Sequence, residues 1–423
     1  MAPAPGRTWA GNLDYSAGEL VEPTSIGQLA EVMAGARRVR VLGSRHSFNR
    51  VADTTGTLVG LRRLPAELEV DGERRVVRAG AGLTYGEVGA RIQEEGWALH
   101  AMASLPHITV GGAVATGSHG SGDGAASLAE GVAAVEVVTT GGEQVRLERG
   151  DPDFGGAVVS LGMLGAVTVV ELEVEPTYDV AQTVYEGLTW DQVVEDLDAV
   201  TGLGTSVSVF TDWRDPDRTT QVWVKDRVDE PRTGSGVPGV DALGLRPADG
   251  PRHMIRGGRP EHCTQQGGVP GPWLDRLPHF RMGFTPSAGE ELQSEWLLPR
   301  RSVGPALERL RGMAGELAGL ALSAEMRTVS CGRQWLDPAQ EDSVAFHVTW
   351  RRDQPAVEAL LPRIEEGLDP LGARPHWGKL FDERALAGRI EELYPQRGRM
   401  LELAARMDPR GALRNDYLER VGL

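Results

Sequence analysis

Two glycine-rich stretches constrain the fold of this chain more than any other feature of its sequence. The first, Val41 to Asn49, follows alternating apolar and basic residues and is typical of a β-strand that enters a tight loop at Gly43-Ser44. The second, Ser104 to Gly124, contains Gly111-Gly112 and Gly117-Ser118-His119-Gly120. Such loops expose backbone N–H groups that can bind a phosphate, and glycine lets the backbone approach a flat ligand closely. Either stretch alone is more often a simple turn, but their combination favours a ligand site.

Neither stretch matches the common nucleotide-binding motifs. No G-x-G-x-x-G lies between a strand and a helix, which disfavours a nicotinamide-binding Rossmann domain. The chain has 44 basic residues, of which only Lys225 and Lys379 are lysines, and neither follows a phosphate loop as a P-loop requires. Where lysine persists against such a bias toward arginine, its compact and titratable ammonium is a candidate functional group. The alternative is that Lys379 is an ordinary surface residue.

Composition disfavours several classes of partner and location. The net charge of −16 and the pI of about 5.1 disfavour nucleic acid and anionic membranes as partners. No uninterrupted apolar stretch reaches the roughly 20 residues of a membrane span, and residues 1–10 lack the pattern of a secretory signal. Cys263 and Cys331 lack the spacing of a zinc site or a disulfide framework. We therefore expect a cytoplasmic protein with reduced thiols and no metal, and we expect a monomer.

Hydrophobic periodicity predicts an α+β mixture without a regular βαβ repeat. Pro23-Thr24-Ser25 is a helix N-cap signal before a helix at 26–33, and Gly141-Gly142 is a hairpin signal between strands at 133–139 and 144–147. Further strands are expected at 39–42, 58–61, 76–79, 165–175, 206–213, 220–225, 294–298, 323–329 and 344–350, and further helices at 83–95, 154–161, 304–321 and 355–368. Residues 229–272 are rich in glycine and proline and predict a long irregular region that could cover a site, with disorder as the alternative at about 230–250.

Two of these strands carry polar residues at alternate positions. Glu325 and Arg327 alternate with apolar residues in one strand, and His347 and Thr349 do so in another. Because successive side chains of a strand point to opposite faces, each pair lies on one face. The two strands together predict a polar wall. The alternative is a solvated sheet face with a surface ion pair, which would contribute little.

Several of these motifs resemble those of a known family. Val41 to Asn49, Met102 to Ile108 and Thr116 to Gly120 are similar to the flavin-domain motifs of the vanillyl-alcohol-oxidase superfamily. Arg374 to Lys379 resembles the late motif of its sugar-alcohol and aldonolactone oxidases, and the likeness is greatest to the alditol (xylitol) oxidases. The resemblance covers nearly the whole chain and is weakest at about 225–260.

This resemblance implies a two-domain α+β flavoprotein. Residues 1–176 would form an FAD-binding domain of the PCMH type, and residues 177–380 a substrate or cap domain on a largely antiparallel sheet. Residues 381–423 would return to the FAD-binding domain.

The resemblance also implies FAD as cofactor, attached covalently to His46. The alternative is a free histidine that contacts the pyrophosphate loop. The implied cofactor-binding set comprises, besides His46, Val41, Leu42, Gly43, Ser44, Arg45, Ser47, Ser104, Thr109, Gly112, Thr116, Gly117, Ser118, His119, Val167 and His376.

The implied reaction is oxidation of the terminal primary hydroxyl of a sugar alcohol, such as xylitol or sorbitol, to the aldose. Hydride would pass to flavin N5, and O2 would become H2O2. Ser104, Glu325, Arg327, Thr349 and Lys379 would bind the neutral polyol through its hydroxyls. Arg327 and Lys379 would stabilise the developing alkoxide. The proton would go either to His347 or to Lys379, its pKa lowered by the nearby Arg327, and the sequence does not decide between them.

Two other functions stay open at this point. One is an aldono-1,4-lactone oxidase or dehydrogenase of the same superfamily, which also carries a His-Trp-Gly/Ala-Lys motif. The other is a non-catalytic protein that binds flavin or carbohydrate. Such a protein would keep the glycine-rich loops but lose the polar wall, whose residues are all present in this chain.

Overall fold

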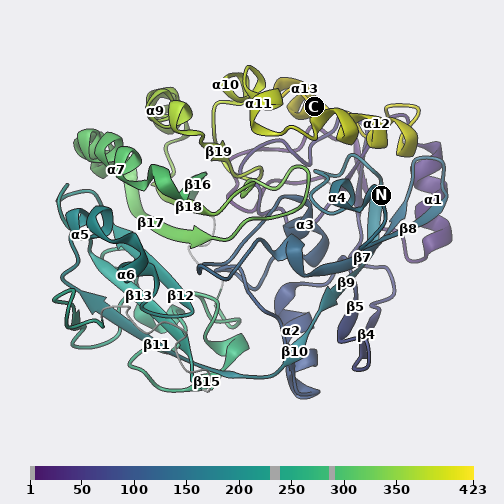
Figure 1. The fold of residues 1–423 in the computed structure, drawn as a ribbon. Coiled ribbons are helices and arrows are strands. Elements are labelled where there is room, and N and C mark those ends of the chain that lie inside the picture. The colour runs from purple at the N-terminus through teal and green to yellow at the C-terminus, as the bar shows by residue number, and fades with distance from the viewer. Residues whose placement is uncertain (1–4, 229–238, 285–290) are drawn as a thin grey trace.

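The computed structural model describes residues 5–228, 239–284 and 291–423, and it shows two sheet-based bodies that lie side by side (Figure 1). The first body holds a small parallel sheet in the order β1-β3-β2, formed by β1 (Glu19–Val21), β2 (Val39–Leu42) and β3 (Thr57–Gly60). Helix α1 (Ile26–Gly35) begins where the sequence predicts, because the side chain of Ser25 accepts a hydrogen bond from the backbone N–H of Gln28.

A five-stranded antiparallel sheet in the order β4-β5-β9-β7-β8 completes the first body. Its strands are β4 (Leu68–Asp71), β5 (Val76–Gly80), β7 (Val132–Val138), β8 (Gln144–Glu148) and β9 (Ala166–Glu173). The predicted hairpin at Gly141-Gly142 is confirmed as β7–β8. Strand β4 was not predicted; it pairs with β5 across a turn in which Asp71 accepts from the backbone N–H groups of Glu73 and Arg74.

The remaining elements of this body are short apart from one helix. They are α2 (Tyr85–Glu94), α3 (Val110–Ala115), α4 (Phe154–Ala157) and the paired two-residue strands β6 (Trp97–Ala98) and β10 (Glu175–Pro176). Helix α2 is capped by the reciprocal hydrogen bonds of Thr84 and Glu87. The helix expected at 154–161 is a single turn, since Gly155 and Gly156 disfavour a longer one.

The second body is built on one largely antiparallel sheet in the order β14-β11-β13-β12-β17-β18-β16-β19, with β15 also paired to β11. Its strands are β11 (Asp179–Glu186), β12 (Ser206–Thr211), β13 (Gln221–Arg227), β14 (Arg246–Pro247), β15 (Gly271–Pro272), β16 (Glu291–Pro299), β17 (Ala321–Val329), β18 (Ser343–Arg351) and β19 (Arg374–Pro375). The α+β class with an antiparallel cap sheet is thus confirmed, although β11 was not predicted.

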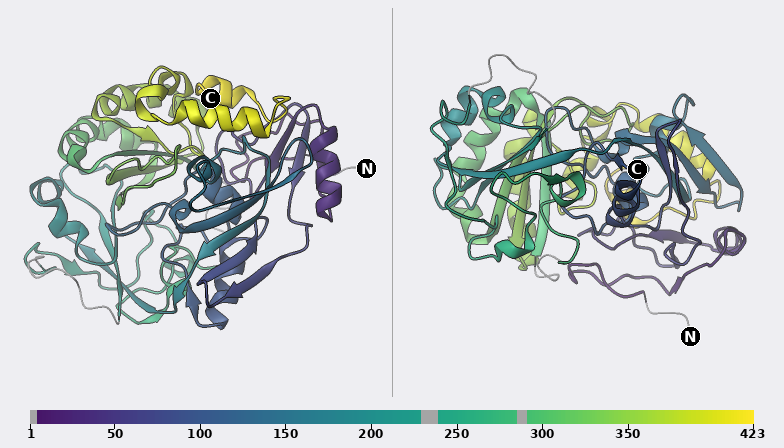
Figure 2. Two further views of the ribbon diagram at one scale, coloured as in Figure 1. Left: turned by 45° about the vertical axis from the view of Figure 1, so that its right-hand side comes forward. Right: turned by 90° about the horizontal axis from the view of Figure 1, so that it is seen from below.

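Helices cover the outer face of this sheet, away from the first body (Figures 1 and 2). They are α5 (Trp190–Glu195), α6 (Leu197–Thr201), α7 (Val303–Gly312), α8 (Ala314–Leu320) and α9 (Gln354–Leu368). Apolar residues of these helices, such as Leu307 and Leu361, pack in one buried cluster with Phe346 and Trp350 of β18. The predicted helix at 304–321 is interrupted at Met313, next to Gly312 and Gly315. The opposite face of the sheet is left to form the site.

The C-terminal helices lie across the first body (Figure 1, yellow). They are α10 (Glu383–Ala387), α11 (Ile390–Leu393), α12 (Arg397–Met407) and α13 (Asp416–Arg420). Leu413 and Tyr417 are buried in the same apolar cluster as Val39, and Arg40 donates to the carbonyl of Leu413 at 3.0 Å. The boundaries 1–176, 177–380 and 381–423 stay a prediction.

The predicted irregular region at 229–272 is described in part. Residues 229–238 lie outside the described residues, and with them part of the segment for which disorder was the alternative. From 239 to 272 the backbone is mostly irregular apart from the short strands β14 and β15. Within the part of the chain that the structure describes, no helix is long and apolar enough to cross a membrane.

Candidate active site

A cavity of about 500 Å³ lies between the glycine-rich loops of the first body and the bare face of the cap sheet. Volumes of this size are typical of small-molecule and cofactor sites. The predicted cofactor-binding residues line this cavity together with Ser104, Glu325, Arg327, His347, Thr349 and Lys379. Gly117 is the exception: a Cβ there would lie 2.8 Å from Cδ of Pro338, and its φ is +66°. Glycine at this position therefore serves the turn and this contact, and the role of Gly117 in binding the cofactor stays a prediction.

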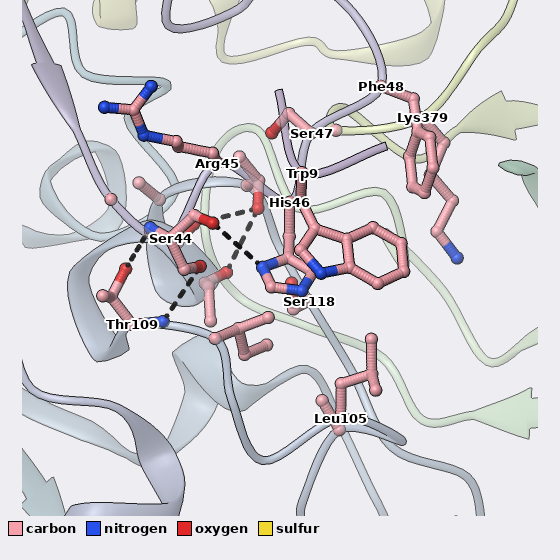
Figure 3. A pocket seen from close by; sticks show the side chains of 18 of the residues that line it. Trp9, Ser44, Arg45, His46, Ser47, Phe48, Leu105, Thr109, Ser118 and Lys379 are labelled. Carbon is pink, nitrogen blue, oxygen red and sulfur yellow. Dashed lines mark hydrogen bonds between the residues drawn. The ribbon is translucent and has the colours of Figure 1, made fainter. Parts of the chain in front are cut away.

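The two glycine-rich loops hold each other. Beyond the end of β2, the backbone N–H of Ser44 donates to Oγ1 of Thr109, and the N–H of Thr109 donates to Oγ of Ser44, both at 3.3 Å (Figure 3). A Cβ at Gly43 would lie 2.5 Å from Oγ1 of Thr109 and 3.6 Å from Cα of Gly112. Glycine is needed here because the loops touch. The cradle that results fits a flat, phosphate-bearing cofactor such as FAD.

The side chain of His46 stands inside this cradle (Figure 3). Its Nδ1 lies 3.1 Å from the carbonyl oxygen of Ser44, which can only accept, so Nδ1 carries the hydrogen. Burial lowers the pKa of His46 to about 4, and the ring is neutral at neutral pH. The indole of Trp9 stacks on it with 4.8 Å between ring centroids. Sequence reasoning missed Trp9, because the docking of the N-terminal segment has no local signal.

Arg45 has a left-handed backbone, with φ of 66°, and its side chain turns away from His46 (Figure 3). Its guanidinium donates to the carbonyls of Pro5 and Arg7. It lies over the ring of Tyr15. The residue therefore ties the N-terminal segment to the loop.

Strand register brings three titratable side chains into one row on the cap sheet. Glu325 of β17 pairs with His347 of β18, and His347 pairs with Glu295 of β16. Directly paired residues of neighbouring strands point to the same face, and all three line the cavity. Thr349 belongs to the next row, paired with Gln293. The predicted polar wall is thus present on the buried face of the sheet.

Glu295 is the hub of this wall, and sequence reasoning missed it. Its Oε1 accepts from Nη2 of Arg327 at 2.7 Å and its Oε2 from Nζ of Lys379 at 2.6 Å. Nε2 of His119 lies 3.4 Å from Oε1. Burial raises the pKa of Glu295, but the charges of Arg327 and Lys379 outweigh burial and hold the pKa well below its usual value. The polar alternation Glu291-Gln293-Glu295 within β16 was the available signal, since the strand was expected only at 294–298.

Lys379 reaches the wall from the loop after β19. The side chain of Asn49 donates to the carbonyls of Trp377 and Lys379 at 2.8 and 2.7 Å, which ties this loop to the His46 loop. Burial is the largest cause that lowers the pKa of Lys379, Glu295 opposes it, and Arg327 adds a smaller lowering effect. Arg327 thus lowers the pKa of Lys379 in the expected direction, and burial contributes more.

His347 and Arg327 complete the wall. Within the described residues, the buried Nε2 of His347 has no hydrogen-bond partner, and its Nδ1 is 3.8 Å from Oε2 of Glu325. Burial lowers the pKa of His347 to about 3, and Lys379 adds to this effect. Arg327 also reaches Ser104 of the first body, with Nη1 3.4 Å from its Oγ. The wall therefore offers a neutral ring nitrogen, two cations and a hydroxyl at one place.

Two further predicted cofactor residues, His119 and His376, lie where the loops meet the wall. His119 keeps its ring in place through Nδ1, 2.9 Å from the carbonyl of Gly120. His376 accepts at Nδ1 from the N–H of Gly378, and burial holds its pKa well below the usual value. Over the described ranges, no group of three or more His, Cys, Asp or Glu side chains could hold a metal ion.

Comparison with known families agrees with this geometry. Residues 18–148 match the FAD binding domain family, which covers the glycine-rich loops and His46. Residues 289–421 match the D-arabinono-1,4-lactone oxidase family, which covers Glu295, Arg327, His347 and Lys379.

Relatives extend over nearly the whole chain. An alditol oxidase from Streptomyces sp. (strain IKD472 / FERM P-14339) is 45% identical over 414 residues, which is 97% of each chain. L-gulono-1,4-lactone dehydrogenase from Mycobacterium tuberculosis is 26% identical over 98% of each chain, and L-gulonolactone oxidase from Bos taurus is 25% identical over 95% of this chain and 94% of its own.

Among solved structures, cholesterol oxidase from B. sterolicum superposes with a TM-score of 0.75 over 99% of this chain and 97% of its own, at 14% identity. This likeness concerns the fold alone. The loops that hold a flavin, the cap sheet and the 45% identity lead to one conclusion: the chain belongs to the alditol oxidase family of FAD-dependent oxidoreductases, within the vanillyl-alcohol-oxidase superfamily.

Proposed function

We propose that this protein oxidises the terminal primary hydroxyl of sugar alcohols, such as xylitol and sorbitol, to the aldose. The observation that carries the proposal is the single cavity in which the FAD cradle meets a wall of hydrogen-bonding side chains. A polyol is neutral and has no apolar end, so its affinity must come from its hydroxyls. A wall built to pair hydroxyls also rejects analogues that lack them, because its own buried groups would be left unpaired.

Each wall residue has a role that its contacts allow. Oε2 of Glu325 makes no hydrogen bond within the described residues and is free to accept one from a substrate hydroxyl. The hydroxyls of Thr349 and Ser104 can both donate and accept. Arg327 and Lys379, held by Glu295, place two cations where the oxygen of the reacting alcohol gains negative charge. When bound between the glycine-rich loops, FAD would supply the acceptor for the hydride, and O2 would be reduced to H2O2.

The proton of the reacting hydroxyl goes to His347 or Lys379, and the contacts favour His347. Its neutral ring has a buried Nε2 without a partner in the described part of the chain. Nζ of Lys379, in contrast, already donates to Glu295 at 2.6 Å and lacks a free lone pair while it carries its charge. His347→Gln should therefore lower kcat with only a small change in KM. Lys379→Met should both lower kcat and raise KM.

We also propose that His46 attaches the FAD covalently. The cradle places the ring in the cavity, and burial lowers the pKa of His46 to about 4, so the ring keeps the lone pair that a carbon–nitrogen bond requires. Stacking on Trp9 holds the ring plane. The guanidinium of Arg45 does not occupy the space beside the His46 ring, because it donates hydrogen bonds to the N-terminal segment.

The test is a steady-state substrate panel with peroxide detection. Xylitol and sorbitol should yield H2O2, with a far lower kcat/KM for aldono-1,4-lactones. The second candidate, a lactone oxidase or dehydrogenase, is favoured by the family match at 289–421. Turnover of lactones without turnover of polyols would replace the proposal by that candidate. Binding of polyols without any turnover would support the non-catalytic alternative.

Further expectations rest on composition alone. We infer from the net charge of −16 that the protein binds neither nucleic acid nor anionic membranes. We also propose a cytoplasmic monomer. Light scattering of the purified protein and fractionation of the producing cells test these two statements.

A further inference from the structure

Both lysines of the chain are connected to the polar wall by hydrogen bonds, although the chain has 44 basic residues. Lys379 contacts Glu295, as described above. Lys225, on β13, is 1% exposed, and its Nζ lies 3.1 Å from Nδ1 of His279. Nε2 of the same ring lies 3.1 Å from Oε1 of Glu325. A chain of hydrogen bonds thus runs from the second lysine to the polar wall. The proposed reaction does not yet use either Lys225 or His279.

Counting donors fixes the direction of these hydrogen bonds. Nζ of Lys225 also donates to the carbonyls of Leu277 and Pro278, which can only accept. Below its pKa of about 7, Lys225 is an ammonium with three hydrogens, so the third points at Nδ1 of His279, which therefore accepts. The ring hydrogen must then be on Nε2, where it donates to Oε1 of Glu325. Burial and the charge of Lys225 lower the pKa of His279 to about 4, in agreement with a neutral ring.

The ring of His279 is fixed on its other sides as well. It makes edge contacts with Trp223 and Phe210, at centroid distances of 5.3 and 5.8 Å. The backbone N–H of His279 donates to the carbonyl of Ser104 at 3.1 Å. One residue therefore contacts two members of the proposed substrate wall, Glu325 through its ring and Ser104 through its backbone.

We propose that Lys225 and His279 are positioning residues for the substrate: Lys225 fixes the neutral ring of His279 with its hydrogen on Nε2, and His279 holds Oε1 of Glu325 so that Oε2 faces a substrate hydroxyl. That a substrate hydroxyl binds Oε2 rests on the proposed function, whereas the hydrogen bonds from Lys225 through His279 to Glu325 do not. A lysine is required at this position because three acceptors surround one compact ammonium, which a planar guanidinium cannot match. This accounts for a lysine at position 225 in a chain that otherwise uses arginine.

A double-mutant cycle tests the relay through activity. His279→Leu should raise KM for xylitol by about 10- to 100-fold, the range of a lost hydrogen bond to a charged group, with a smaller change in kcat. His279→Gln should recover part of this loss, because its amide can donate to Glu325. Because the relay acts through Glu325, His279→Leu should add little to Glu325→Gln. His262→Leu is the control, since that ring stacks on Phe284 and does not line the cavity, and it should leave KM unchanged. If the fold-increases in KM of His279→Leu and Glu325→Gln multiply in the double mutant, the proposal is overturned.

A second measurement does not depend on the substrate. In the holoenzyme labelled with 15N-histidine, the His279 ring is identified by its loss in H279Q. At pH 6 it should show a protonated Nε2 and a bare Nδ1. Lys225→Met removes the cation and the donor at Nδ1, so the pKa of the ring should rise and the 15N shift of Nδ1 should change. A bare Nε2 in the unmodified protein, or no change in Lys225→Met, would refute the relay. The 15N measurement needs no substrate. Failure of the proposed function, shown by a lack of polyol oxidation, is therefore distinguishable from failure of the relay.

Discussion

Substitution of Glu295 by Gln is the most informative perturbation of the site. The change keeps the shape of the side chain but removes the negative charge that Arg327 and Lys379 share at 2.7 and 2.6 Å. An amide can accept from one cation, but its NH2 group then faces the other. Removing one partner of a buried ion pair costs about 3–5 kcal/mol, and since the amide keeps one acceptor, we expect a loss of about 3 kcal/mol in the free energy of unfolding.

The same change should reduce catalysis. Without Glu295, burial and Arg327 lower the pKa of Lys379 further, with Glu325 opposing them, so the positive charge of Lys379 is weakened. Loss of about 2–3 kcal/mol of alkoxide stabilisation corresponds to roughly a 100-fold lower kcat/KM for xylitol. Urea unfolding and steady-state peroxide production measure the two effects.

Glu171→Gln is the matched control for this prediction. Glu171 is 4% exposed and also bridges two cations, Arg146 at 2.8 Å and Arg74 at 3.0 Å, but it does not line the cavity. Its partners are 35% and 55% exposed, so solvent screens the pairs and the expected loss of stability is about 1 kcal/mol. Its kcat/KM should stay unchanged. Equal effects of the two substitutions on stability and on kcat/KM would refute the assignment of Glu295 as the hub.

Three further predictions concern the cradle and the second lysine. Denatured wild-type protein should retain the mass of FAD in mass spectrometry and His46→Ala should not; release of the flavin from the wild type would refute the covalent bond. Gly43→Ala should lower the free energy of unfolding by about 1–3 kcal/mol and weaken FAD retention, because its Cβ would lie 2.5 Å from Oγ1 of Thr109; melting and flavin absorbance measure this, and an unchanged melting temperature would contradict it. Burial lowers the pKa of Lys225 from 10.5 to about 7, so the unfolded chain binds more protons between these values, and the free energy of unfolding should rise with pH there by up to about 1.4 kcal/mol per unit. Lys225→Met should flatten that rise in urea unfolding at pH 7 to 10, and parallel curves would contradict the assignment.

The sequence predicted the parts of the fold that local chemistry decides. Ser25 marks the start of α1 because its hydroxyl caps the first turn, and Gly141-Gly142 marks the β7–β8 hairpin. Strand β11 was missed because the change in amino-acid composition after residue 176 did not show where a strand begins, and β11 is defined by its pairing with β13. The break between α7 and α8 at Met313 was missed because apolar periodicity continued across Gly312.

The site was predictable where alternation along one strand shows it. Glu325 with Arg327, and His347 with Thr349, could be found from period two alone. Glu295 lies in a similar alternation in β16, but its place beside His347 needs the pairing of β16 with β18. The relay from Lys225 to His279 needs contacts between residues 54 positions apart. His279 has no local pattern that distinguishes it from other histidines. Trp9 reaches His46 only because the N-terminal segment packs over the loop.

Rapid anaerobic mixing of the holoenzyme with xylitol tests the central claim most directly, namely that the FAD cradle and the hydroxyl-pairing wall act on one substrate in one cavity. The account predicts that the yellow absorbance is lost on mixing in the wild type and that this loss is at least tenfold slower in Glu325→Gln, with the Glu171→Gln protein behaving as the wild type. A flavin spectrum that persists with xylitol and sorbitol but bleaches with an aldono-1,4-lactone would contradict it.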